Sequence, residues 1–178
     1  MLKRNVIGLR WVVLILLAVV ISAPDMYAKK KKEDKDTYAW RYEIEPVEGA
    51  VPGACRVKVW TYAKKADKAI AQAPKNAVHG IIFKGYAANP EARVPGRRAM
   101  VTDYAVEQEF ADYFEEFFAD GGRYMRFVSL VNNGAPMAGD VIKVGKEYKM
   151  GIIVMVKTDE LRKELESAGV LKSLNSGF

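Results

Sequence analysis

The sequence predicts an α+β fold, a mixed α/β sandwich in which helices pack on one sheet. Two patterns indicate it. Some segments alternate apolar and polar residues, as half-buried strands do. Others space apolar residues three and four apart, as helices with one buried face do. In chain order the elements are β-β-α-β-α-β-β-β-α, in a single domain over residues 38–178.

The first 28 residues are predicted to be a signal peptide. Positive charges precede an uncharged apolar run at residues 11–23, and they come from Lys3, Arg4 and Arg10. The run is short for a membrane-spanning helix, and Ala28 is the expected residue before the cut. The alternative is an uncleaved anchor, because positive charge just after the run opposes its translocation. The expected location is therefore periplasmic or secreted, or membrane-anchored if the leader is retained.

Residues 29–37 are predicted to be a charged, disordered linker, since residues 29–36 include no apolar side chain to bury. Its four lysines would favour weak contact with an anionic membrane surface; they are Lys29, Lys30, Lys31 and Lys32. They also account for most of the formal net charge of +6. No concentrated basic face remains for nucleic acid.

The domain is expected to begin with a β-hairpin. Residues 38–45 alternate cleanly, residues 55–63 read as a second strand, and a Gly/Pro-rich turn joins them. Trp40, Trp60 and Tyr62 offer flat aromatic faces for a small molecule or glycan, provided that they share an exposed side. The alternative is that the tryptophans belong to the core.

An alanine-rich helix is predicted next, from residue 66 to a stop at Gly80. Pro74 should kink it or divide it into two short pieces. His79, the only histidine, would then bond the last helix carbonyls. The apolar run at residues 81–86 reads as a buried strand.

A long polar loop, residues 87–100, is expected to reach a partner. Its arginines, Arg93, Arg97 and Arg98, would pair with the partner's carboxylates. The alternative is ordinary loop solvation.

A helix at residues 104–120 follows, capped by Thr102 or Asp103, and its aromatic stripe is predicted to be core.

The C-terminal part is predicted to complete the sheet. Residues 123–131 read as a strand, and a shorter strand and a turn at Gly145-Lys146 come next. The continuous apolar run at residues 150–156 indicates a central strand covered on both faces. Residues 158–169 form the last helix, capped by Thr158 or Asp159, with Leu161 and Leu165 turned inward.

The sequence offers few groups for catalysis or metal binding. It has one histidine and one cysteine, so a structural zinc site and an internal disulfide are excluded. Cys55 is expected to be a small buried strand residue. The acidic residues between 104 and 120 form a solvated helix face rather than an acid–base pair. We expect no enzymatic activity, no cofactor and no metal.

Three segments, AIAQAPKNAVHGIIFKGY, YFEEFFADGGRYMRFVSLV and GKEYKMGIIVMVKTDELRKELESAGV, resemble a family of small exported bacterial proteins that has no assigned activity. The plan is also distantly similar to the periplasmic domain of the curli-secretion channel and related small envelope lipoproteins. It departs from them in lacking a lipid-modified cysteine and in carrying Pro74. The resemblance implies action by protein–protein contact. We therefore expect a non-enzymatic protein that binds an envelope or surface protein.

Overall fold

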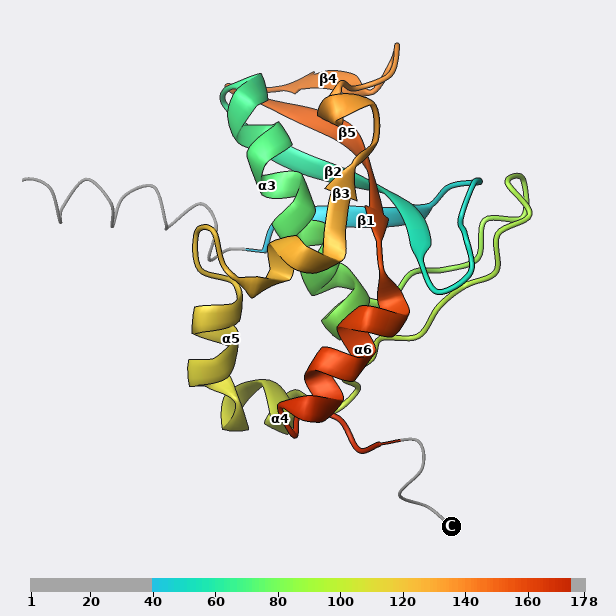
Figure 1. Cartoon of the computed structure of the whole chain (residues 1–178). Helices are drawn as coiled ribbons and strands as arrows, with labels where there is room; N and C mark the ends of the chain where they lie inside the picture. The colour runs from blue at the N-terminus through green and yellow to red at the C-terminus, as the bar shows by residue number, and fades with distance from the viewer. Residues whose placement is uncertain (1–39, 174–178) are drawn as a thin grey trace, which may run out of the picture. The chain divides into compact units, whose positions relative to one another are not determined.

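The computed structural model describes residues 40–173 (Figure 1). It confirms the α+β class. The described residues form one antiparallel sheet of five strands: β1 (Tyr42–Pro46), β2 (Cys55–Ala63), β3 (Val128–Leu130), β4 (Val141–Val144) and β5 (Glu147–Val156). The sheet order is β1-β2-β5-β3, and β4 pairs with the first half of β5. The predicted signal peptide at 1–28 and linker at 29–37 lie outside the described residues.

The predicted hairpin is confirmed, and its alternation defines the two sheet faces. β2 pairs antiparallel with both β1 and β5. Every second residue of β2, from Cys55 to Ala63, is buried. Because directly paired residues point to the same face, the remaining β2 side chains share the other face with Glu43 and Lys149.

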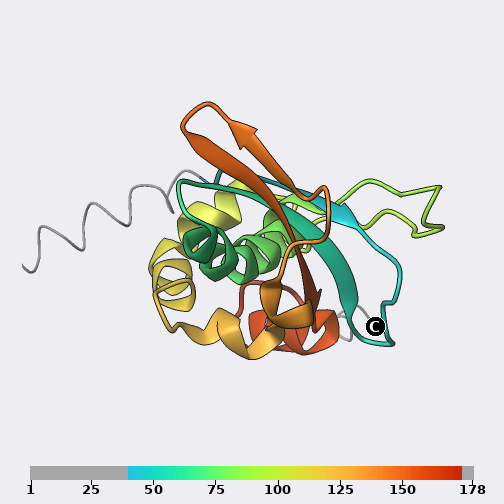
Figure 2. The same ribbon diagram turned by 90° about the horizontal axis from the view of Figure 1, so that it is seen from above.

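Helix α3 (Ala66–His79) packs against the buried sheet face, as Figure 2 shows from above. Ala69, Ala73 and Ala77 have no exposed surface. Their small side chains let the helix approach the sheet closely. Pro74 lies within one continuous helix, so the chain does not divide there into two short helices.

The strand predicted at residues 81–86 is wrong. Instead, a π-helical turn, η2 (Gly80–Lys84), continues α3. Gly80 has helical angles (φ −60, ψ −42), so it does not end the helix, and the turn ends at Gly85, whose φ is +66. Ile81 and Ile82 are fully buried in this conformation. A short apolar run fits a buried strand and a buried helical turn equally well, which explains the error.

The single helix predicted at residues 104–120 is broken at Phe110 into α4 (Tyr104–Glu109) and α5 (Ala111–Phe117). Asp103 is the cap, accepting a hydrogen bond from the Ala105 N–H at 2.9 Å. The aromatic core prediction holds best for the second half. Of the predicted stripe, Phe114 and Phe117 are buried, whereas Val106, Phe110 and Tyr113 are half-buried. Phe118, which the predicted stripe did not include, is buried as well.

The structure confirms part of the prediction for the C-terminal elements. The strand predicted at 123–131 is shortened to β3, between two 3-10 turns, η3 (Arg123–Phe127) and η4 (Val131–Gly134). Helix α6 (Thr158–Ser167) buries Leu161 and Leu165 as predicted. Neither predicted cap is used. The N-cap is Lys157, whose side chain makes no capping hydrogen bond, and the Thr158 hydroxyl instead donates to the Gly53 carbonyl at 3.1 Å.

Candidate interaction surface: the open sheet face and the β4–β5 hairpin

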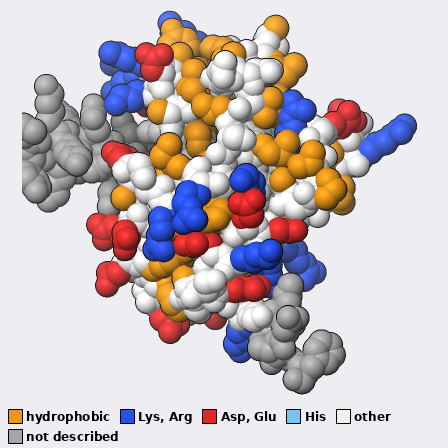
Figure 3. Space-filling view, viewed as in Figure 1, with side chains coloured by type: hydrophobic (Ala, Val, Ile, Leu, Met, Phe, Trp, Pro, Cys, Tyr) orange, Lys and Arg blue, Asp and Glu red, His pale blue; other side chains and the backbone are white. Residues whose placement is uncertain are grey.

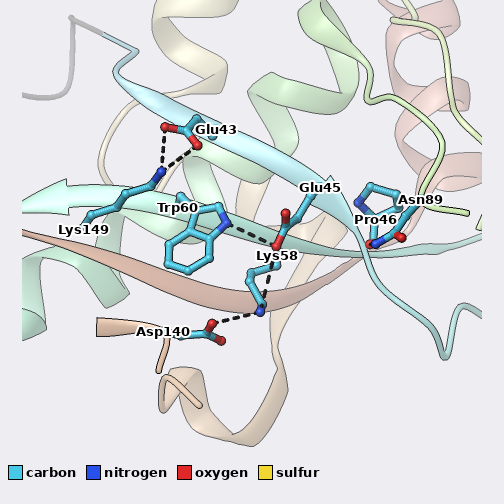
Figure 4. A network of polar contacts seen from close by, with 8 residues as sticks. All are labelled: Glu43, Glu45, Pro46, Lys58, Trp60, Asn89, Asp140 and Lys149. Carbon is cyan, nitrogen blue, oxygen red and sulfur yellow. Dashed lines mark hydrogen bonds and ion pairs between the residues drawn. The ribbon is translucent and has the colours of Figure 1, made fainter. Parts of the chain in front are cut away.

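The sheet face opposite α3 carries a network of polar side chains around Trp60 (Figure 4). The Trp60 indole N–H donates to Glu45 at 3.2 Å. Two ammonium groups flank the ring, with the Lys58 and Lys149 nitrogens 5.4 and 5.1 Å from its centroid. Such cation–π contacts attract the two ammonium groups to the ring electrostatically.

Glu43 ties β1 to its neighbour β2 and, across β2, to β5. It accepts hydrogen bonds from Lys149 Nζ at 2.7 and 2.8 Å and from the Tyr62 hydroxyl at 2.9 Å. These bonds, the Lys149 bond first, lower the pKa of Glu43. The bond to Glu43 raises the pKa of Lys149. The Arg41 guanidinium carbon lies 4.2 Å from the Tyr62 ring centroid.

The structure brings two of the three predicted stacking residues together. Trp60 and Tyr62 lie on the same open face of β2. Trp40 is not part of the strand, because β1 begins at Tyr42 and Trp40 has a positive φ of 39°. The strand predicted from residue 38 is therefore shorter than expected. Positively charged side chains contact both rings, so a stacked ligand would have to displace them.

Lys58 and Asp140 anchor the start of β4 to the sheet. Lys58 Nζ lies 3.0 Å from Asp140 Oδ1, with side-chain exposures of 17% and 10%. Gly151 makes room for this pair: a Cβ there would lie 3.0 Å from the Lys58 stem and 3.2 Å from the Asp140 side chain. The outer face of β5 is thus covered at Gly151 by side chains of neighbouring segments.

The β4–β5 hairpin, with the predicted turn at Gly145-Lys146, projects from the end of the sheet (Figures 1 and 2). All four residues of β4 are exposed. Ile142 retains 46% of its accessible surface. The other exposed apolar side chains here are Val141, Val144 and Tyr148. We call these four residues the hairpin apolar cluster.

β4 also presents an open backbone edge. Within residues 40–173, β4 pairs with β5 alone. The Gly151 N–H donates to the Asp140 carbonyl at 2.8 Å. Because bonded and non-bonded pairs alternate in an antiparallel ladder, Ile142 bonds to β5 while Val141 and Lys143 turn their N–H and C=O groups outward. Such groups are free to pair with another extended chain.

Lysines surround the hairpin apolar cluster. Lys143 and Lys146 are exposed on the hairpin itself. Lys64 and Lys65 are exposed just after Ala63, which pairs with Tyr148 at the same end of the sheet. Figure 3 shows basic and hydrophobic side chains together at this end of the domain. The surface therefore combines apolar area with positive charge.

Residues 87–100, the predicted partner-binding loop, form an irregular excursion. Two isolated bridges close it, Tyr86 to Arg97 and Asn89 to Val94. Arg93 and Arg98 are exposed, whereas Arg97 is half-buried and its backbone pairs with that of Tyr86 through two hydrogen bonds of 2.9 Å. The loop thus presents two of its three arginines freely to solvent, and their role in partner contact stays a prediction.

Cys55 lies beside this loop and is buried, as predicted, with 4% of its surface exposed. Burial raises the pKa of its thiol to about 11, although Arg97 and Tyr86 partly oppose the shift. The thiol is therefore protonated at neutral pH, which is the unreactive form.

His79 does not cap a helix end, contrary to the prediction. It is buried, and its Nδ1 lies 2.6 Å from the Tyr42 hydroxyl. The Phe83 and Phe118 rings contact it at centroid distances of 4.9 and 5.7 Å. Burial, followed by the charges of Lys84 and Lys75, lowers the pKa of His79 to about 3. His79 is a neutral core residue that joins α3 to β1.

Comparisons with known proteins found no matching family model, no similar curated protein and no similar solved structure. The resemblance to exported envelope proteins therefore stays a prediction. Within residues 40–173 no helix has the length and apolar character needed to cross a bilayer. The same residues include no group of three or more histidine, cysteine or carboxylate side chains placed to hold a metal ion.

Sequence reasoning missed the hairpin apolar cluster. It identified the short strand and the turn but treated them as ordinary sheet. One signal was available: in the segment VIKVGKEYK, Lys143 and Lys149 interrupt the apolar residues on both sides of the Gly145-Lys146 turn. Alternation alone does not reveal that both sides of β4 face solvent.

Proposed function

We propose that this protein is a non-enzymatic, exported envelope protein that acts by binding another envelope or surface protein. The observation that supports this best is the exposure of four successive β4 residues, three of them branched and apolar. Soluble domains seldom expose several large apolar side chains on one short strand unless these form a contact surface. The β4–β5 hairpin is the proposed contact site.

The alternative, a small-molecule or glycan-binding domain, would use the open sheet face. Trp60 and Tyr62 do lie there, but Glu45 and Glu43 accept hydrogen bonds from their polar atoms, and Lys58 and Lys149 contact the Trp60 ring. The geometry therefore favours protein binding at the hairpin over ligand stacking on β2.

A photo-crosslinking amino acid placed at Ile142 in native cells tests the proposal. Lys163, an exposed residue of α6, is the matched control position. We expect one protein adduct, identified by mass spectrometry, from position 142 and none from position 163. Val144→Ser should reduce its yield. Absence of an adduct at 142, or equal adducts at both positions, would contradict hairpin binding.

Export is tested by the intact mass of the protein recovered from soluble and membrane fractions of the envelope. We expect a chain that begins at Lys29 in the soluble fraction. A full-length chain in the membrane fraction would instead establish the retained anchor, and the proposal of a released, exported domain would fail.

A further inference from the structure

The hairpin surface also indicates what kind of segment it would bind, an inference that rests on the proposed function. The outward N–H and C=O groups of Val141 and Lys143 supply the hydrogen bonds that one added strand requires. We propose that β4 binds an extended segment of a partner protein, in which apolar residues alternate with acidic ones.

The two faces of β4 determine this alternation. Ile142 and Val144 share one face, and Val141 and Lys143 share the other. An added strand places its own alternate residues beside each set. Apolar residues would extend the surface of Ile142 and Val144, and a carboxylate would lie beside Lys143. Both faces are thus matched by one simple pattern.

Lys143 discriminates between partners. In a pairing of β4 with β4 of a second copy, two Lys143 ammonium groups would either lie opposite each other or face Val141 across the pair. Lysine in an edge strand opposes such self-pairing. An acidic partner residue converts the same charge into a favourable cross-strand pair. Charge complementarity therefore favours an acidic segment over a second copy.

A membrane surface would provide partners for fewer of the groups at this site than a peptide strand would. Lipid headgroups would meet the lysines, and the acyl region would meet the hairpin apolar cluster. However, the outward backbone groups of Val141 and Lys143 would lose water without gaining ordered partners, which is costly in an apolar medium. A peptide strand satisfies the side chains and the backbone together.

Two synthetic peptides test the inference on the full chain, one alternating valine with glutamate and the other alternating valine with lysine. Amide hydrogen exchange and NMR shifts of β4 are the readouts. We expect the acidic peptide to protect the amides of Val141 and Lys143 and to bind about fivefold more tightly than the basic one. Lys143→Glu should reverse this preference.

A matched pair of variants tests the backbone contribution. Lys143→Pro and Lys143→Gln both remove the charge, but only proline removes the outward N–H, and neither removes a bond to β5. We expect Lys143→Gln to bind the acidic peptide weakly and Lys143→Pro to lose binding entirely, with the rest of the spectrum unchanged in both. Equal binding by the two variants would overturn strand addition.

The other occupants have distinct signatures. Protection of β4 that rises with protein concentration without peptide would identify a second copy and overturn the inference. Shifts caused by phosphatidylglycerol vesicles but by neither peptide would identify a membrane and overturn it as well. If the Ile142 adduct forms in cells while the acidic peptide fails to bind, the hairpin binds a protein but does not do so by strand addition to β4. If neither occurs, the proposed function itself fails.

Discussion

The Tyr42 hydroxyl and the Nδ1 atom of His79 lie 2.6 Å apart in the core, joining the first strand of the sheet to the end of the helix that covers it. The only histidine of the chain thus serves the packing of β1 on α3. Because the bond is buried, it is worth more than an equivalent bond at the surface.

Stability should depend on pH through His79. Its pKa falls from 6.5 to about 3 in the folded state, so the unfolded chain binds a proton that the folded chain does not bind between these values. Stability is therefore complete above pH 6.5 and decreases as the pH falls, by about 1.4 kcal/mol per pH unit. Urea unfolding between pH 8 and pH 5 measures this slope, since carboxylates contribute mainly at lower pH.

The control for this prediction is His79→Gln, which removes the titrating group and keeps a polar side chain. It should lower stability overall but flatten the slope between pH 6.5 and 5. A slope that persists unchanged in this variant would show that another group is responsible.

Substitution of Gly85 should be unusually damaging. Gly85 has a φ of +66, and a Cβ there would overlap the carbonyl oxygen of Arg97. Gly139 has a φ of +89 but nothing within 4 Å of its Cβ position. Gly139→Ala should cost about 1 kcal/mol from backbone strain alone, and Gly85→Ala about 3 kcal/mol, because overlap is added. Thermal unfolding compares the two, and equal losses would refute the overlap argument.

Removal of Lys58 should destabilise the start of β4. Lys58→Met leaves the Asp140 carboxylate buried without its cation, at an expected cost of about 3 kcal/mol. Combining Lys58→Met with Asp140→Asn should recover part of the lost stability, since the unpaired carboxylate charge is then absent. Chemical unfolding of the two single variants and the double variant gives the coupling. Additive losses would mean that the pair contributes little.

Cys55 should resist thiol reagents in the folded protein. Its thiol is buried and its pKa is raised to about 11. We expect modification by an aromatic disulfide only at the rate of unfolding, so that adding urea accelerates it steeply. Rapid labelling in buffer would show that the region around Cys55 and Arg97 opens without global unfolding.

The sequence predicts what depends on local pattern. The alternation of β2, the hairpin turn at Gly145-Lys146 and the inward leucines of α6 follow from periodicity and turn chemistry, and the structure confirms them. Local sequence pattern fails to predict an element whose conformation is determined by tertiary contacts. The run at residues 81–86 satisfies a strand as well as a helical turn, and the structure favours the turn, in which Ile81 and Ile82 are buried.

Local sequence pattern also predicts only part of the candidate interaction surface. Trp60 and Tyr62 are correctly placed on one face because β2 alternates, whereas Trp40 leaves the strand through a positive φ that tryptophan rarely adopts. The exposure of β4 depends on which strands flank it. That is a property of sheet order, which no local pattern encodes.

The position of β5 has a mechanical consequence. β5 carries the hairpin at one end and pairs with β2 through nine residues, from Tyr148 to Val156. A partner that pulls the hairpin along the direction of β5 would load all of those hydrogen bonds at once, in shear. A pull across the strand would open them one after another. A tether attached at the hairpin would therefore hold far more force along the strand than across it.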